Sequence, residues 1–263
     1  MKFLQLNEDI LAVILLFVDN SSAKQLSVTC QALFPLATCH LVRAPAFALH
    51  SDQVRAFKRF LLSDRGRIWI PYLRRIAISS EACHKPRGLG SAEFLYASLD
   101  YGLPSVLAEI IEEARNLARI ELSYTEHLLV HGPRLRRALV NHGGIESVTF
   151  SDAGLLAKRT LSGMSRLRSV SLSTTYPSDV VTVLAPHAST LRSILIVNTN
   201  PRASATGYEE DAEKTRAEET IEVPQDISFP NVTEMWMYRL CMSDEDFARV
   251  FPKARRCIAC QPA

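Results

Sequence analysis

The sequence predicts an α/β protein in which short parallel strands alternate with helices along most of the chain. Large apolar residues recur at positions 1, 4 and 6 of short segments, and helical segments lie between them. With 47% hydrophobic residues among 263, the chain can bury a sizeable core. Disorder as the overall state is therefore excluded. The net charge of +2 lacks the one-sided excess that is typical of a nucleic-acid-binding protein.

The N-terminal residues predict a helical module. The segment 6–20 reads as a helix, with Asn7 or Asp9 available as its cap and Asp19 near its end. Its apolar residues lie on every face, because Val13 and Phe17 add to a stripe that is already broad. Such a helix must be covered on two sides, and another protein can supply one of them. A second helical run follows, and Pro35 breaks it or starts a third.

The apolar run 10–18 has the length of the hydrophobic part of a signal peptide. However, Glu8 and Asp9 stand where a signal peptide carries positive charge, and the run is too short for a bilayer that needs about 20 apolar residues. We therefore expect neither secretion nor a membrane span. The six cysteines form no obvious disulfide framework, which favours a reducing compartment.

The spacing of particular residues in 6–37 matches a known motif. The matching residues are Leu6, Asp9, Ile10, Leu11, Ile14, Leu15, Phe17, Val18, Asp19, Leu26, Thr29, Cys30, Leu33, Leu36 and Ala37. In this order the segment resembles an F-box. It has Asn7, Thr29 and Leu33 where the family usually has Pro, Val and Trp. Each of these three residues keeps the physical role of the usual residue, since Asn can cap a helix, Thr is β-branched and Leu is large and apolar.

The 1-4-6 pattern recurs down the rest of the chain. Its matches are Leu73-Ile76-Ile78, Leu117-Ile120-Leu122, Ile145-Val148-Phe150, Leu167-Val170-Leu172, Leu191-Ile194-Ile196, Val232-Met235-Met237, the weaker Ala254-Cys257-Ala259 and a degenerate start at Ala44-Phe47-Leu49. The pattern resembles leucine-rich repeats, and five of the seven offsets fall in or at the edge of the usual window of about 20 to 29 residues. Helices are expected between the strands, over 52–62, 91–99, 104–115, 128–140, 155–161, 178–184 and 244–250.

These features predict a module over 1–43 and an irregular leucine-rich-repeat solenoid over 44–263, with parallel strands on the concave face and helices outside. Two offsets are long. Between 73 and 117 one repeat is expected to have lost its strand. Between 191 and 232 the residues 201–227 are expected to form a disordered acidic insert, since 208–222 alone carries a net charge of −5. A charged lid, or phosphorylation of Thr215 or Thr220, is the open alternative.

Positions 3, 5 and 7 of each strand are expected on the concave face. In the middle strands these positions are almost all Ser or Thr. Apolar and aromatic side chains gather toward the C-terminal end, and exposed Trp and Tyr are typical interface anchors. The candidate target-binding residues are Leu195, Val197, Trp236, Tyr238 and Ile258. The alternative is that Trp236 packs under the insert or against the last helix.

Catalytic and metal-binding patterns are weak. Cys257 and Cys260 have the spacing of half a zinc site without a second pair, and His127 and His131 lack a third ligand. No nucleophile elbow, dinucleotide-binding or P-loop motif occurs in the sequence. Basic clusters lie mainly on expected helices and turns, without interleaved aromatic residues. We expect no enzyme activity, no cofactor, no metal and no nucleic-acid partner.

The resemblance to F-box and leucine-rich-repeat proteins implies a substrate-recognition subunit of an SCF-type cullin-RING ubiquitin ligase, acting in the cytoplasm or nucleus. The F-box would dock a Skp-type adaptor, and through it a cullin, while the solenoid would bind a protein target. The resemblance makes seven residues the candidates for adaptor contact: Leu6, Ile10, Leu11, Ile14, Leu15, Leu26 and Leu33. The alternative is a repeat scaffold whose N-terminal helices are only a cap, with no role in ubiquitin transfer.

Overall fold

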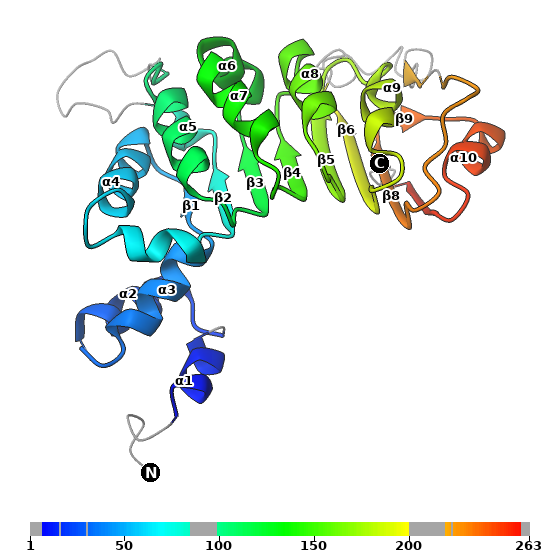
Figure 1. The fold of residues 1–263 in the computed structure, drawn as a ribbon. Helices are drawn as coiled ribbons and strands as arrows, with labels where there is room; N and C mark the ends of the chain where they lie inside the picture. The colour runs from blue at the N-terminus through cyan, green and yellow to red at the C-terminus, as the bar shows by residue number, and fades with distance from the viewer. Residues whose placement is uncertain are drawn as a thin grey trace, which may run out of the picture.

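A computed structural model of the chain describes residues 7–15, 17–29, 31–84, 99–199, 219–221 and 223–258. Three helices come first, α1 (Glu8–Leu15), α2 (Asn20–Thr29) and α3 (Phe34–Arg43). They lie below one end of a parallel sheet in the view of Figure 1, and further helices line one face of that sheet. The expectation of an α/β protein with parallel strands is confirmed.

The main sheet has eight strands, and their spatial order follows the chain. The strands are β1 (Ala46–Phe47), β2 (Arg75–Ile78), β3 (Arg119–Leu122), β4 (Ser147–Phe150), β5 (Ser169–Thr174), β6 (Ser193–Asn198), β8 (Glu234–Tyr238) and β10 (Arg255–Ile258). Every neighbouring pair is parallel. Each strand must therefore be followed by a connection that returns to the same edge of the sheet.

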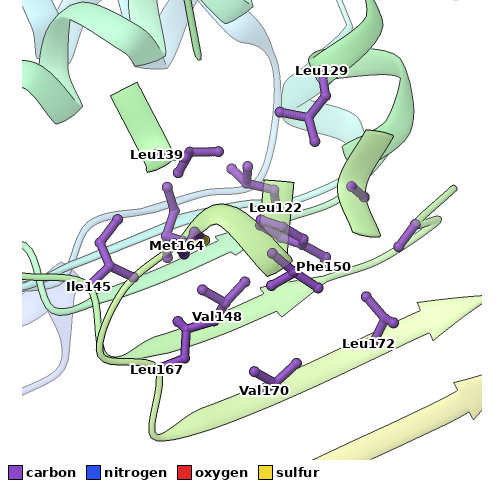
Figure 2. Close-up of a cluster of buried hydrophobic side chains, with 14 of the residues drawn as sticks. Leu122, Leu129, Leu139, Ile145, Val148, Phe150, Met164, Leu167, Val170 and Leu172 are labelled. Atoms are coloured by element: carbon purple, nitrogen blue, oxygen red, sulfur yellow. The ribbon is translucent and has the colours of Figure 1, made fainter. Parts of the chain in front are cut away.

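The core follows from the 1-4-6 pattern. In β2, β4, β5 and β6 buried residues alternate with half-buried ones, because successive side chains on a strand point to opposite faces. The register places the same pattern position side by side, so that Ile120, Val148 and Val170 form one apolar row. Figure 2 shows Val148 and Val170 of this row beneath side chains from the neighbouring helices, together with the fully buried Phe150 of β4.

The connecting helices are α4 (Ser51–Leu61), α5 (Leu103–Glu113), α6 (Thr125–His131), α7 (Pro133–Asn141), α8 (Leu155–Gly163), α9 (Val180–Leu184) and α10 (Asp244–Val250), with short 3-10 turns η2 (Arg67–Tyr72), η3 (Glu81–Cys83) and η4 (Ala185–His187). The single helix expected over 128–140 is wrong, because Gly132 and Pro133 divide it. A Cβ at Gly132 would lie 2.5 Å from Cβ of Pro104, and Pro133 has no backbone N–H to continue a helix. Most of the helix expected over 91–99 lies outside the described residues.

Polar contacts tie successive helices together. The Glu126 carboxylate, on α6, accepts hydrogen bonds from the backbone N–H groups of Gly154, Leu156 and Ala157 at 2.9 to 3.0 Å. A side chain from one connection thereby caps the start of α8 in the next. On α8, the buried Lys158 ammonium contacts the Asp179 carboxylate, just before α9. These contacts fix each connection relative to its neighbour.

The Arg55–Asp100 ion pair joins α4 to the start of α5 and makes stability depend on pH. Arg55 donates to both carboxylate oxygens of Asp100, with Nη2 to Oδ1 at 2.7 Å. Burial acts to raise the pKa of Asp100, but hydrogen bonds from Arg55 and from the Gly102 N–H outweigh it, and the pKa is lowered. A lowered carboxyl pKa stabilises the fold above the unfolded-state value of about 3.9, and this stabilisation is lost as the pH falls through the folded-state pKa.

We therefore expect Asp100→Asn to lower the free energy of unfolding at pH 7 by about 1.5 to 3 kcal/mol, the range for hydrogen bonds to charged groups. The difference from wild type should shrink as the pH falls from about 4 toward 2. Urea denaturation of both proteins across this range measures it. A difference that stays constant to the lowest pH would contradict this role of the ion pair.

The predictions for the two long intervals between matches, 73 to 117 and 191 to 232, have different outcomes in the structure. Strand β2 pairs directly with β3, as expected if one repeat has lost its strand. In the second interval, β7 (Glu219–Thr220) pairs with β9 (Leu240–Cys241) in a separate two-stranded sheet, and Ile221 is buried. The disorder predicted for the whole of 201–227 is therefore wrong for its C-terminal part, because an apolar side chain and a strand pairing hold that part in place. Residues 201–218 lie outside the described residues.

Candidate functional site

The N-terminal helices form a small module that packs against the rest of the chain through α3. Helix α2 packs along α3, and α3 in turn contacts η2. The interior of the module consists of Ala23, Leu33, Ala37 and Val42, all buried. Pro35 lies in the first turn of α3, where its missing N–H costs no helical hydrogen bond. The module is thus held at one end of the sheet, with α1 at its outer end (Figure 1).

Local capping sets where α1 and α2 begin. The side-chain oxygen of Asn7 accepts a hydrogen bond from the Asp9 N–H at 3.1 Å, so the cap expected from the sequence is present. Asp19 caps α2 in the same way, accepting from the backbone N–H of Ser22 at 3.0 Å and from its hydroxyl at 2.7 Å. These hydrogen bonds, the hydroxyl one foremost, lower the pKa of Asp19.

Helix α1 is apolar on its outer side as well as its inner side. Leu11 and Leu15 are buried against the module, with exposed fractions of 6% and 4%. Ile10 and Val13 are exposed at 50% and 55%, and Phe17, in the turn after α1, is exposed at 86%. Because these three residues are spaced three and four apart, helical geometry places Ile10 and Val13 on one face, which continues toward Phe17. We call Ile10, Val13 and Phe17 the outer α1 surface.

The seven candidate adaptor residues divide by burial. Ile10 is exposed, Ile14 and Leu26 are half-buried, and Leu6 lies outside the described residues. Leu11, Leu15 and Leu33 are buried in the module, so this structure does not expose them to an adaptor, and their contact with one stays a prediction. Their physical role is to hold α1 and the turn before α3 against the rest of the module.

The structure also exposes apolar residues of the module that were not among the seven candidates for adaptor contact. They are Val13, Phe17, Val28 and Phe34, with exposed fractions from 46% to 86%. The sequence already places the first two, Val13 and Phe17, outside the apolar stripe that one packed face of α1 would require. Exposed apolar groups that gather on one small module are typical of a protein-binding surface.

The open face of the sheet, opposite the helices, carries the second candidate surface. Along β4 and β5, and at the residue that follows β4, its side chains are half-buried hydroxyls: Ser147, Thr149, Ser151, Ser169, Ser171 and Ser173. At the N-terminal end, Arg75 and Arg119 both pair with Glu121, at 2.7 and 2.6 Å. Burial acts to raise the pKa of Glu121, but the two arginines outweigh it and the pKa is lowered. The hydroxyl region is therefore flanked on this side by a charged cluster.

On the other side of the hydroxyl region, β6 and β8 bring four candidate target-binding residues together. Leu195 lies beside Trp236, and Val197 lies beside Tyr238, in the strand register. Trp236 is exposed at 39%, whereas Leu195, Val197 and Tyr238 are half-buried. Trp236 is thus not packed away beneath other segments in the described part of the chain. Ile258 lies on the adjacent strand β10, but its side chain is outside the described residues.

Groups that could support chemistry are few in the described residues. No cluster of three or more His, Cys, Asp or Glu side chains in these residues could hold a metal ion. His127 and His131 lie together on α6, with ring centroids 4.5 Å apart. Burial, aided by Glu81, raises the pKa of the Cys83 thiol to about 12, so this cysteine is a protonated thiol at neutral pH. The side chains of Cys257 and Cys260 lie outside the described residues.

None of the described helices has both the length and the apolar character to cross a bilayer. Comparison with models of protein families and with curated proteins finds no match. The two candidate surfaces, the outer α1 surface and the apolar end of the open sheet face, therefore carry the functional argument.

Proposed function

We propose that the chain is a non-catalytic substrate-recognition subunit of an SCF-type cullin-RING E3 ubiquitin ligase. In this proposal helices α1–α3 form a divergent F-box that docks a Skp-type adaptor. The parallel strands and outer helices form a leucine-rich-repeat solenoid, and its open face binds a protein target. The chain supplies recognition, and its partners supply the chemistry of ubiquitin transfer.

The observation that carries the proposal is the exposure of the outer α1 surface. Ile10, Val13 and Phe17 remain in contact with solvent although Leu11 and Leu15 on the same segment are buried. A helix that served only to cap the sheet would need apolar groups on its inner side alone. A second protein that covered the outer α1 surface would gain roughly 25 cal/mol for each Å² of apolar area removed from water.

The solenoid part of the proposal draws on the regularity of the sheet. From β2 to β8 the positions 4 and 6 of each match are buried in register, and the strand order follows the chain. Stacked units of this kind expose a continuous face to a partner. In this chain that face offers hydroxyls in the middle and apolar area around Trp236 and Leu195. We therefore expect the target to contact the apolar end with an aromatic or aliphatic side chain.

The alternative function is a repeat scaffold whose N-terminal helices are only a cap. It is favoured by the burial of Leu11, Leu15 and Leu33, because these three of the seven candidate adaptor residues serve the packing of the module itself. The two functions differ in what covers the outer α1 surface. In the scaffold it stays in solvent, and in the ligase subunit the adaptor covers it.

Assembly of the ligase core tests the proposal directly. We expect the purified full chain, a Skp-type adaptor and a cullin to elute together in size-exclusion chromatography as a ternary complex. The variant Trp236→Ser should assemble equally well, because Trp236 lies on the sheet and not on the module. Elution of the folded wild-type chain apart from the adaptor would overturn the ligase proposal and leave the scaffold.

A further inference from the structure

The two edges of the sheet carry opposite charge. One edge is formed by the segments that lead into β2–β6 and β8. These segments hold seven Arg and three Glu, a net charge of +4, and they are residues 72–75, 113–119, 141–147, 163–169, 187–193 and 228–234. The segments at the opposite edge hold eight Asp or Glu and one Arg, a net charge of −7. They are residues 78–81, 99–102, 122–126, 150–155, 174–179 and 238–246. Because all strands are parallel, each set lies along one edge of the sheet.

The basic edge contains a groove beneath the ends of α5 and α7. Two adjoining hollows of about 420 and 750 Å³ share Glu112, Asn141 and His142 in their walls. The first is also lined by Arg134 and Arg137, and the second by Arg115 and Arg166. We call this feature the arginine groove.

Most of the positive charge in the arginine groove is not neutralised locally. Arg134 pairs with Glu112, with Nη2 2.6 Å from Oε2. Arg115, Arg137 and Arg166 form no ion pair within 4 Å among the described residues, although Arg137 lies near enough to help Arg134 lower the pKa of Glu112. Three exposed guanidinium groups therefore remain available, each with a planar set of donors that matches a carboxylate.

Histidine side chains bond one carbonyl group near the end of α5 and one near the end of α8. The imidazole Nε2 of His142 donates to the Ala114 carbonyl oxygen after α5 at 3.0 Å, and its Nδ1 accepts from the Gly144 N–H at 3.2 Å. The Nε2 of His187 donates in the same way to the Leu161 carbonyl oxygen near the end of α8, at 2.8 Å. Histidines thus supply the hydrogen bonds that a basic residue often gives to terminal carbonyls.

The backbone conformation at Arg166 also indicates that this arginine has a role beyond the turn. Its φ of 62° lies in the left-handed region, where glycine is the least costly residue. An arginine at this turn position adds strain to the backbone and places a guanidinium in the wall of the groove. The turn alone therefore does not explain this side chain.

We propose that the arginine groove binds an acidic segment of a partner protein, an extended stretch with several Asp or Glu side chains. The arginines are spread over two hollows and do not converge on one point, which fits several carboxylates along a chain better than a single phosphate group. The Glu112 carboxylate in the wall and the lack of Phe, Tyr and Trp among the lining residues disfavour a nucleic-acid strand. The inference uses no residue of α1–α3 and is independent of the adaptor proposal.

The test is fluorescence anisotropy of the full chain with labelled peptides of about ten residues. One peptide alternates Glu with Gly, a second has Gln for each Glu, and a third carries a single phosphoserine among neutral residues. A single-stranded oligonucleotide is the fourth probe. We expect the Glu peptide to bind most tightly, and to weaken severalfold between about 50 and 200 mM NaCl because salt screens exposed charges.

Substitutions of the groove arginines test whether the Glu peptide binds in the arginine groove. Arg115→Gln, Arg137→Gln and Arg166→Gly combined should weaken the Glu peptide by about tenfold or more, since each removes one charge that faces it. Arg166→Gly alone should weaken binding while the thermal midpoint holds or rises, because glycine relieves the left-handed backbone. Arg159→Gln, an exposed arginine on α8 outside the groove, is the control and should bind within about twofold of wild type.

Three results would overturn the inference. They are the absence of Glu-peptide binding at the lower salt concentration, binding that the folded triple variant retains, and tighter binding of the phosphoserine peptide or the oligonucleotide. The last result would identify a different ligand class for the same groove.

Discussion

Phe150→Ala should lower the free energy of unfolding by about 3 to 5 kcal/mol, the range for large-to-small changes at a buried aromatic residue. Phe150 is fully buried at position 6 of its match on β4, between Leu122 on β3 and Leu172 on β5. Figure 2 shows its ring inside the apolar cluster beneath the helices. The neighbouring strands and helices prevent the space from collapsing, so a cavity remains. Urea denaturation followed by circular dichroism measures the loss.

A matched control separates burial from the chemistry of the substitution. Phe17→Ala removes the same atoms from a side chain that is 86% exposed, and it should change the free energy of unfolding by no more than about 0.5 kcal/mol. Equal effects of the two substitutions would contradict the arrangement in which positions 4 and 6 of each strand build a common core.

The sheet could be predicted from the sequence because its signal is local and repeated. Each 1-4-6 match requires three large apolar residues at fixed spacing, and the burial of one match supports the next. Residues at positions 4 and 6 of the matches, such as Ile120 and Leu122, are then buried in the core and lie in register with the same positions of the neighbouring strands. Position 4 of the first match, Phe47, is buried in the short strand β1, whereas position 6, Leu49, is exposed.

Other elements gave weaker signals. The break at Gly132-Pro133 is visible in the sequence, but the amphipathic pattern runs through it and favoured one helix over 128–140. The two-residue strand β7 has no pattern of its own, and its pairing with β9 depends on contacts between residues 21 positions apart along the chain, Glu219 with Leu240 and Thr220 with Cys241. Composition alone marked this region as acidic and polar, which predicts disorder but does not detect one buried anchor such as Ile221.

The candidate site shows a similar division. A helix with apolar residues on every face is expected to be covered on two sides. The spacing of its apolar residues does not indicate which side is covered by the chain itself. The sequence therefore selected Leu11 and Leu15 together with Ile10, and the structure separates the first two as core. At the open sheet face, by contrast, the alternation along a strand assigns Leu195 and Trp236 to one side, and the register confirms that they are neighbours.

The division of α1 into two sides predicts a large effect on adaptor binding. Ile10→Lys combined with Val13→Lys should weaken binding by more than about a hundredfold, since two apolar contacts worth roughly 1.5 to 3 kcal/mol each would be lost. Because both side chains are exposed, the double variant should fold as wild type does. Leu15→Lys is unsuitable for this purpose, since it would bury a charge in the module and unfold it.

Isothermal titration of the full chain with a Skp-type adaptor is the most direct test of the proposal that the outer α1 surface docks a second protein. We expect binding with a dissociation constant of about 1 µM or tighter and a negative heat-capacity change, the mark of apolar burial. The double lysine variant should give no measurable heat, and Leu155→Lys, at an exposed apolar residue of α8, should bind as wild type does. Equal binding by the double variant, or no binding by the folded wild-type chain, would contradict the account.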